Sequence, residues 1–581
     1  MNRSLEERTV LPTPVPTFLL VGPYDPSCGE YTFLAPPLAV WRLAGVLRSA
    51  GHRATVFDPN CCEGTPESAL TEIVEAEAWT VVGFSMTGMT LRHDLALAHL
   101  VYRLAPEALQ VAGGMEATFN PDAIFRLGPI ELVVLGEGEN PLLEVASRLQ
   151  AGASLTGIEG TAFLGPDRKL RRLPQIALSR QQLRDAIYAT PYDEMPYRTY
   201  WRRLETAYRI RELPYKADRE ARLAEIRSVR LVTLNYCPMG CTFCSSTNFL
   251  NAAQGSTARI ARLETEECVT MMDRILTAQP EVRTIIFQDD IFVFPADRRI
   301  LPLCQAIQNA KADGHLPQYL GFISTNRIDA MTPERLSAMR CAGFRVLGFG
   351  IENFSLAVLT EFKKAQIYHR IVTVLGSALN LGITPFLDLI LTSPRCCLGD
   401  LAETIRQAHY WTRAGCETGM YPYVIPFSGA ALAADLSLRP HTVYSRHHIS
   451  GTNITWNQPA KILPLDLEVR EAILTIEARF EACLGTLEGS GWHLPSRVRS
   501  FLWIACSIPV LRRAGQLMPS LGLVVDNLLS HLPGLGPHER QDLVHELEAQ
   551  PRSDAACRRN SNLSSRDEAS AAEGPGIRRR S

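Results

Sequence analysis

The stretch Asn235-Tyr236-Cys237-Pro238-Met239-Gly240-Cys241-Thr242-Phe243-Cys244 decides the fold of this 581-residue chain. Its three cysteines are spaced C-x3-C-x2-C and follow residues 229–234, whose alternating, β-branched pattern predicts a strand. Pro238 and Gly240 favour a turn, which brings three thiolates around one point. A structural zinc site requires four ligands, whereas an iron–sulfur cluster with one open iron can bind a further ligand at that iron.

The aromatic residue before the third cysteine completes a resemblance to the radical S-adenosylmethionine (SAM) superfamily, whose signature is C-x3-C-x-aromatic-C. Cys237, Cys241, Phe243 and Cys244 occupy its positions. The resemblance implies that the cysteines hold a [4Fe-4S] cluster and that its unligated iron chelates SAM. One electron then cleaves SAM to methionine and a 5′-deoxyadenosyl radical. A zinc knuckle or three buried free thiols is the alternative interpretation.

Composition restricts the class of protein. The chain is 46% hydrophobic and 21% charged, with a net charge of −2, which gives no electrostatic reason to expect nucleic acid or an anionic membrane as a partner. Fifteen cysteines without a framework pattern are typical of reduced thiols, so we expect a cytoplasmic protein. Residues 501–511 are apolar but too short to span a membrane, so we expect a buried helix there.

Strands and helices alternate over residues 17–150. Predicted strands lie at residues 18–22, 55–58, 79–85, 109–114 and 132–139, with helices between them. This alternation predicts an open, doubly wound parallel sheet. Ligands of such sheets bind outside the carboxyl ends of the strands, which here are followed by the loops Pro23–Glu30, Ser85–Thr90, Gly113–Met115 and Glu137–Glu139.

Several segments of this region together resemble the cobalamin-binding domain that precedes many radical SAM enzymes: Pro36–Ala39 leading to Gly51-His52, Val81–Ser85, Gly113-Gly114 and Gly136–Glu139. The resemblance implies a cobalamin site with contacts from Ser85, Thr87, Gly113, Gly114 and Glu137. No D-x-H-x-x-G motif occurs in this region, so cobalamin is expected to bind without a protein histidine on cobalt. The alternative is a flavodoxin-like sheet with another ligand.

Six predicted strand–helix units follow from residue 229 onward, with strands at residues 229–234, 284–287, 320–324, 345–352, 384–391 and 419–426. They predict a partial (β/α)6 barrel whose active site faces the carboxyl ends of the strands. Resemblance to the superfamily implies that Gln288, Asp289 and Asp290 receive the amino group of SAM, and that Arg327 and Glu352 contact its carboxylate or ribose. Pro426–Leu432 approximates the superfamily segment P-x-P-G-T-x-L.

The whole chain is therefore expected to be an α/β protein. The expected parts are an N-terminal tail (1–16), a cobalamin-binding sheet (17–175) that ends in a hairpin from residue 151, a connector (176–228), a radical SAM barrel (229–450), a helical C-terminal domain (451–550) and a disordered tail (551–581). In the helical domain Trp456, Trp492 and His493 are substrate-site candidates without an assigned role.

The resemblance implies a cobalamin-dependent radical SAM methyltransferase. A carbon without a lone pair cannot attack an electrophilic methyl group, so the deoxyadenosyl radical first abstracts a hydrogen atom and the substrate radical then takes a methyl from methylcobalamin. Expected partners are a small-molecule substrate and a one-electron reductant such as flavodoxin or ferredoxin. Radical cyclisation or ring rearrangement is an alternative on the same scaffold, and a non-enzymatic cobalamin or metal sensor is a further one.

Overall fold

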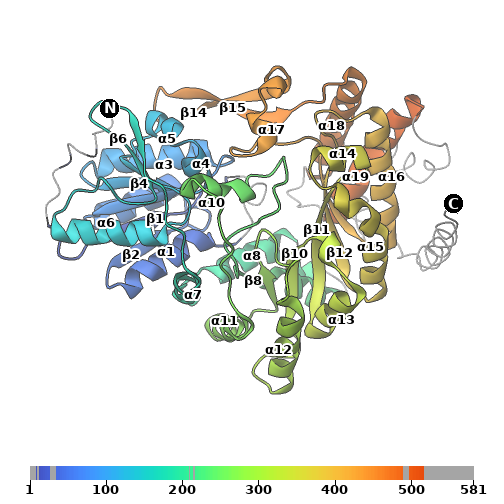
Figure 1. Cartoon of the computed structure of the whole chain (residues 1–581), viewed down its shortest axis with the longest axis horizontal. Helices are drawn as coiled ribbons and strands as arrows, with labels where there is room; N and C mark the ends of the chain where they lie inside the picture. The colour runs from blue at the N-terminus through green and yellow to red at the C-terminus, as the bar shows by residue number, and fades with distance from the viewer. Residues whose placement is uncertain are drawn as a thin grey trace, which may run out of the picture. The chain divides into compact units, whose positions relative to one another are not determined.

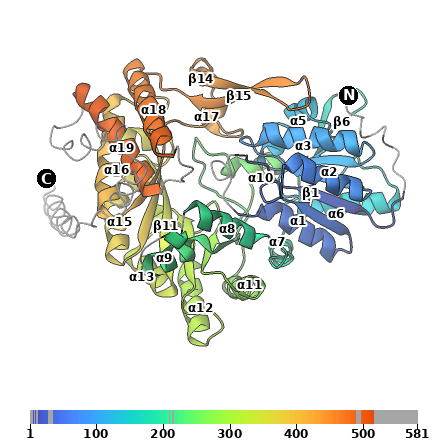
Figure 2. The ribbon, with the colours of Figure 1, turned by 180° about the vertical axis from the view of Figure 1, so that it is seen from behind.

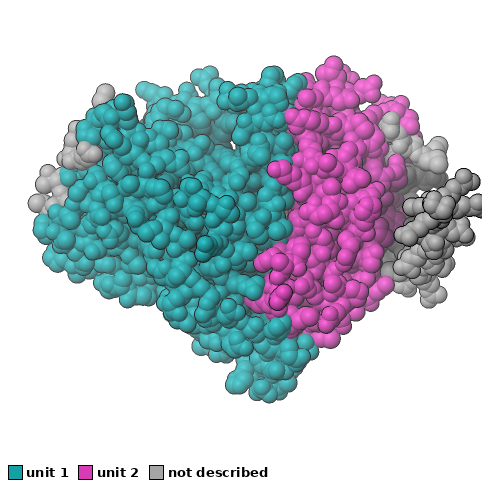
Figure 3. Space-filling view, in the orientation of Figure 1, with its two compact units in different colours: residues 1–292, 302–324, 424–463 teal, residues 293–301, 325–423, 464–581 magenta. Residues whose placement is uncertain are grey.

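The computed structural model describes residues 5, 8, 12–26, 35–208, 210–212, 216–488 and 496–515. It divides into two compact units, shown in two colours in Figure 3. The first comprises residues 1–292, 302–324 and 424–463, and the second comprises residues 293–301, 325–423 and 464–581. Within the described residues, no helix is long and apolar enough to cross a membrane. The predicted tail (551–581), Trp492, His493 and residues 27–30 of the first loop lie outside the described residues.

A seven-stranded sheet in the first unit has the strand order β2-β1-β3-β4-β5-β6-β7. Its parallel strands are β1 (Thr17–Val21), β2 (Arg53–Phe57), β3 (Val81–Ser85), β4 (Leu109–Gly113) and β5 (Leu132–Val134). β1 lies between β2 and β3, since Leu20 pairs with Val56 on one side and with Gly83 on the other. The strand order therefore reverses between β1 and β3, and such a switch point is where doubly wound sheets bind ligands.

The helices between these strands begin and end at residues that favour helix termini. α2 (Pro66–Ala76) has proline in its first turn and is capped by Thr65, whose hydroxyl accepts the Ser68 N–H at 3.2 Å. α6 (Glu139–Ala151) ends at Gly152, which takes the left-handed conformation. α1 (Leu38–Ser49) contacts α6, and α2 contacts α3 (Leu91–Leu104) (Figures 1 and 2). The predicted doubly wound sheet is confirmed.

An antiparallel hairpin and three helices follow. β6 (Thr161–Leu164) and β7 (Leu170–Arg172) pair with each other, and β6 adds to β5. The connector contains α7 (Arg180–Tyr188), α8 (Tyr197–Ala207) and α9 (Lys216–Ile226). Tyr200 and Trp201 are buried: the Tyr200 hydroxyl donates to Asp58 at 2.8 Å, and the Trp201 indole donates to the Ser228 carbonyl at 3.0 Å. These two side chains attach α8 to the loop after β2 and to β8.

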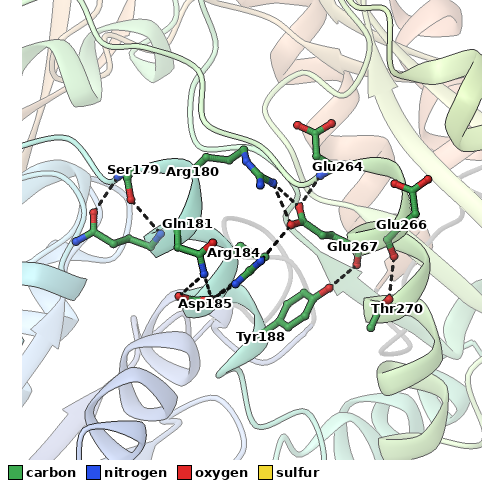
Figure 4. Close-up of polar contacts among 11 residues, drawn as sticks. Ser179, Arg180, Gln181, Arg184, Asp185, Tyr188, Glu264, Glu266, Glu267 and Thr270 are labelled. Atoms are coloured by element: carbon green, nitrogen blue, oxygen red, sulfur yellow. Dashed lines mark hydrogen bonds and ion pairs between the residues drawn. The ribbon is translucent and has the colours of Figure 1, made fainter.

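Charged groups hold the connector helix α7 to α11 (Thr265–Ala278) (Figure 4). Arg180 and Arg184 both pair with the Glu267 carboxylate, at 2.8 and 3.6 Å, and the Tyr188 hydroxyl donates to the Glu267 carbonyl at 3.2 Å. The same carboxylate accepts the Glu264 N–H at 2.7 Å at the start of its own helix. One side chain therefore caps α11 and docks the connector on it.

The second sheet contains the six strands β8 (Ser228–Leu231), β9 (Thr284–Phe287), β10 (Gly321–Asn326), β11 (Phe344–Glu352), β12 (Thr384–Ile390) and β13 (Glu417–Tyr421). They stand in sequence order, and the pairs β8–β9, β9–β10, β11–β12 and β12–β13 are parallel. Helices such as α13 (Pro333–Ala342) and α16 (Leu398–Ala414) connect them. The predicted partial (β/α)6 architecture is confirmed.

A second antiparallel hairpin was not expected from the sequence. β14 (Thr442–His448) pairs with β15 (Thr455–Ile462), so an extended segment crosses residue 450, where a helical domain was expected to begin. Ile449 is buried in the core of the first sheet domain, where Ile454 and Trp456 also pack. Gln458 donates to the Gly88 carbonyl at 2.5 Å. The hairpin therefore belongs to the first unit and covers part of the first sheet domain.

Two long helices end the described part of the second unit. α18 (Leu467–Glu488) and α19 (Ser496–Arg513) lie where the sequence predicts helices. Their contact includes Phe480 stacked on Trp503, with ring centroids 4.0 Å apart. The Ser500 hydroxyl donates to the Thr418 carbonyl of β13 at 2.5 Å. The apolar residues 501–511 form a buried helix, as predicted.

Candidate functional site

The three cysteines lie on the loop between β8 and α10 (Ser246–Gln254). Cys237, Cys241 and Cys244 are free thiols with partly exposed side chains. Gly240 takes a positive φ of 66°, and its N–H donates to the Thr247 hydroxyl at 2.9 Å, which folds the loop back onto the start of α10. The Cys244 sulfur accepts the Ser246 N–H at 3.5 Å. The turn between Cys237 and Cys244 is the one that the sequence predicts.

A buried carboxylate fixes the entry to this loop. Asp289, at the carboxyl end of β9, accepts the N–H groups of Thr233 and Leu234 at 2.6 and 3.0 Å and the Thr233 hydroxyl at 2.5 Å. Its side chain is only 4% exposed. Because both oxygens are already bonded, the structure gives Asp289 a role in positioning the cysteine loop. The predicted direct contact of Asp289 with SAM stays a prediction.

The thiols and Asp290 influence one another electrostatically. Burial, with smaller contributions from the neighbouring Asp290, Cys244 and Cys241, raises the pKa of Cys237 to about 12. Asp290 remains reachable by solvent, but the surrounding protein raises the pKa of its carboxyl group. As they stand, no three His, Cys, Asp or Glu side chains of the described residues are arranged to hold a metal ion.

The donor set nevertheless fits an iron–sulfur cluster with one open iron. Three thiols come from one eight-residue turn, Cys237–Cys244, and each keeps part of its surface exposed. A cluster would bind them as thiolates and so would offset the raised pKa of Cys237. Phe243 stands in the same loop with a partly exposed side chain. Gln288 is bonded to the Arg230 guanidinium of β8.

The loops after β1 and β3 meet at the switch point of the first sheet. The buried Asp94 of α3 accepts the Tyr24 N–H at 2.8 Å and the Thr90 hydroxyl at 2.6 Å. Thr90 also bonds Thr87, with 2.8 Å between the hydroxyl oxygens. Burial raises the pKa of Asp94 to about 8. One carboxyl group therefore ties both loops together at the edge where a ligand is expected.

At the end of β4, the backbone at Gly114 lies close to the backbone at Met86. Gly114 has a φ of 95°, and a Cβ at this position would lie 2.7 Å from the Met86 carbonyl oxygen, so only glycine fits. The Gly114 carbonyl accepts the Thr118 hydroxyl at 2.9 Å. At Gly113 a Cβ would make only ordinary contacts. Ser85, at the end of β3, is partly exposed at the same edge. Gly114 therefore packs directly against the backbone of the loop that follows β3.

The β5–α6 loop bonds directly to the start of the cysteine loop. The Glu137 carboxylate accepts the Asn235 side-chain amide at 3.4 Å, and its second oxygen has no hydrogen-bond partner within the described chain. Burial, and after it the neighbouring Glu139 charge, raise the pKa of Glu137 to about 7. Glu139 pairs with Arg42 at 2.6 Å. An orphaned buried oxygen at the predicted ligand edge fits a ligand that donates hydrogen bonds there.

Residues 426–432, the segment that resembles P-x-P-G-T-x-L, reach both the first sheet domain and the cysteine region. The Ser428 hydroxyl donates to Glu116 at 3.0 Å and accepts Asn120 at 2.7 Å. The Gly429 carbonyl accepts Asn248 of α10 at 2.6 Å, and the Leu432 N–H donates to the Thr242 carbonyl at 2.9 Å. α10 itself contacts α4 (Met115–Phe119) (Figure 1).

In the second unit, both predicted SAM contacts have local partners. Arg327 makes a bidentate pair with Asp329, with both N–O distances 2.8 Å. Glu352 pairs with Lys364 at 2.7 Å and holds a positive φ of 65°, which is rare for a residue with a side chain. The predicted roles of these residues stay predictions.

Sequence reasoning missed the residues that connect these elements. Asn235, Glu116, Asn120 and Ser428 all act through partners that are distant in the chain, with a separation of 98 residues for Asn235–Glu137 and 312 for Ser428–Glu116. Asn235 lies just before Cys237, which was the one local signal available for it. The role of Asp94 was also not foreseen.

Comparisons with known proteins agree with this geometry. Residues 26–146 match the B12-binding domain family. An uncharacterized methyltransferase of Pyrococcus horikoshii is 23% identical over 399 residues, which are 68% of this chain and 77% of that protein. The cytidylyl-2-hydroxyethylphosphonate methyltransferase of Streptomyces wedmorensis is 24% identical over 434 residues, which are likewise 68% of this chain and 77% of that protein.

Solved structures share the fold. OxsB, a cobalamin-dependent S-adenosylmethionine radical enzyme with aqua-cobalamin bound, has a TM-score of 0.65 at 13% identity, covering 96% of this chain and 81% of that one. The radical S-adenosylmethionine methyltransferase TsrM of Kitasatospora setae, with cobalamin and a [4Fe-4S] cluster bound, has a TM-score of 0.59 at 15% identity, covering 86% of this chain and 99% of that one. These likenesses extend over both sheets.

Proposed function

We propose that this chain is a cobalamin-dependent radical SAM methyltransferase that methylates an unactivated carbon, or a phosphinate phosphorus, of a small-molecule substrate. One observation carries the proposal. The cysteine loop bonds directly to the ligand edge of the B12-binding domain through Asn235 and Glu137. Chemistry that needs both cofactors at one substrate requires this proximity.

When bound, the cluster and SAM supply one-electron cleavage of a sulfonium bond, and cobalamin supplies a transferable methyl group. Cys237, Cys241 and Cys244 would hold the cluster, and Asp289 keeps their loop in place through the Thr233 and Leu234 N–H groups. Asp290 lies close enough to the thiols to act on their charge, and we assign it to the amino group of SAM.

The corrin would lie against the carboxyl edge of the first sheet. Ser85 and Thr87 would offer hydroxyls to it, the backbone at Gly113 and Gly114 would line the same edge, and the unpartnered oxygen of Glu137 would accept a hydrogen bond from it. Ser428, which is bonded to Glu116, fixes the segment that touches both cofactor regions. The electron comes from a one-electron reductant such as flavodoxin or ferredoxin.

The test is anaerobic turnover with SAM that carries a deuterated methyl group, on the reconstituted enzyme with a panel of candidate substrates. The proposal predicts a product heavier by one labelled methyl group, together with both S-adenosylhomocysteine and 5′-deoxyadenosine. A second arm uses N235A, which removes the bond between the cysteine loop and Glu137 and also the acceptor of the Ala261 N–H. It should lower methyl transfer more than it lowers SAM cleavage.

Two other outcomes would contradict the proposal. Deoxyadenosine without S-adenosylhomocysteine, with a product of unchanged methyl content, would identify a cyclase or ring-rearranging enzyme. Cobalamin binding without any reductive cleavage of SAM would identify a sensor.

A further inference from the structure

One carboxylate in the second unit stands between two positions without side chains. Asp388 of β12 pairs with Gly350 of β11 on one side and with Gly419 of β13 on the other. Residues paired in neighbouring strands project to the same face of a sheet. A Cβ at Gly419 would lie 3.3 Å from an Asp388 carboxylate oxygen. The space beside this carboxylate therefore depends on glycine in the neighbouring strand.

Asp388 has no hydrogen bond or ion pair with any residue that the structure describes, and part of its side chain is exposed. Its nearest cation is already bound elsewhere. The Lys364 ammonium donates to Glu352 at 2.7 Å and to the Gly350 carbonyl at 2.5 Å. The Lys364 charge acts to lower the pKa of Asp388, but it does not outweigh burial and the Glu352 charge. Loss of hydration and the nearby Glu352 raise its pKa to about 7.

We propose that Asp388 is the group that binds a primary ammonium group of the substrate. This inference rests on the proposed function, because it takes this face of the second sheet as the substrate side. An ammonium group supplies both the charge and the N–H donors that this carboxylate lacks. An anionic substrate group would meet two carboxylates and a lysine that is already paired.

Aromatic side chains beside the carboxylate specify the rest of the ligand. Phe386 lies two residues before Asp388 and therefore on the same face of β12. Tyr421 of β13 pairs with Ile390, one row further toward the carboxyl ends, and burial, followed by the Asp388 and Glu352 charges, raises its pKa. The ligand class is thus an amine on an apolar or aromatic body.

The test measures binding of three shape-matched probes to the reconstituted holoenzyme at pH 8: phenethylammonium, 2-phenylethanol and 3-phenylpropionate. Isothermal titration is done without reductant, so no turnover is involved. The wild type should bind the ammonium probe at least ten times more tightly than the carboxylate probe. D388N should lose that preference, while the visible absorption of the cluster and the affinity for SAM stay unchanged.

A second pair of variants avoids changing the charge. G419A adds a methyl group beside the carboxylate and should weaken phenethylammonium binding at least fivefold. G376A is its control, because a Cβ at Gly376 meets nothing within 4 Å, and it should leave binding unchanged.

Three results would overturn the inference: no detectable phenethylammonium binding by the wild type, equal binding by wild type and D388N, or a D388N defect confined to SAM. The last would assign the carboxylate to the cofactor. Failure of the proposed function is distinguishable, because it would appear in the methyl-transfer products and leave these binding constants unaffected.

Discussion

Replacing Gly429 with alanine should loosen the segment that joins the B12-binding domain to the cysteine region. Gly429 has a φ of 85°, and a Cβ there would lie 2.2 Å from Cε1 of the Phe119 ring. Two separate penalties follow. A residue with a side chain in the left-handed region costs about 1–2 kcal/mol, and the overlap with Phe119 is an overpacking that costs about 1–3 kcal/mol. The sum is about 2–5 kcal/mol.

Native-state hydrogen exchange of the Leu432 amide is a direct assay, because this N–H donates to the Thr242 carbonyl at 2.9 Å and is protected only while the segment is docked. A loss of about 3 kcal/mol would speed its exchange roughly a hundredfold. The F119A background removes the ring, so G429A should then retain only the backbone penalty of about 1–2 kcal/mol. G376A, in the helix α15 (Ile371–Asn380), is the control and should not speed this exchange.

The double-mutant cycle decides whether the reasoning is right. Coupling between Gly429 and Phe119 of more than about 1 kcal/mol is expected, since the two positions would share an overlapping volume. Unchanged exchange in G429A, or effects that add within about 0.5 kcal/mol, would refute the contact.

Two further predictions concern buried carboxyl groups. D289N should weaken the bonds to the Thr233 and Leu234 N–H groups by about 1.5–3 kcal/mol and reduce iron loading, measured as visible absorption per chain, whereas D313N on an exposed site should not. Because burial raises the pKa of Asp94 to about 8, the folded state keeps a proton that the unfolded chain loses above about pH 4, so the free energy of unfolding falls between these pH values. D94N cannot ionise, so its stability relative to the wild type, from urea unfolding, should rise across that window, and a constant difference would contradict the assignment.

Local patterns were enough to predict both sheets. The β-branched run before Cys237, the turn residues after it and the alternating strands and helices each depend on neighbouring residues, so they can be recognised without tertiary contacts. The three-cysteine spacing predicts a cofactor class for the same reason.

The rest could not be predicted because it depends on contacts between distant segments. The hairpin β14–β15 is stabilised by burial of Ile449 against a domain far earlier in the sequence, while its own residues alternate between partly buried and exposed positions. Arg327 directly follows β10 and Glu352 ends β11, so both lie at strand ends as the sequence predicts. Their pairing with Asp329 and Lys364 depends on turns whose geometry the sequence pattern does not specify.

The open side of Asp388 was likewise not visible in the sequence. Gly350 and Gly419 stand 38 and 31 residues away from it, and only the register of three strands places them in one row. From the sequence alone, a glycine in a strand indicates only that the strand is destabilised there. Its role in leaving space becomes clear only when the residues paired with it in the neighbouring strands are known.

The central claim is that Cys237, Cys241 and Cys244 hold a cluster with one iron open to SAM. Its most direct measurement is the electron paramagnetic resonance spectrum of the anaerobically reconstituted, reduced enzyme, before and after addition of SAM, beside the C237A/C241A/C244A variant and the C341A/C397A control. The account predicts a cluster signal that SAM shifts in the wild type and control and that is missing from the triple variant. A signal that survives loss of all three cysteines, or that SAM leaves unchanged, would contradict it.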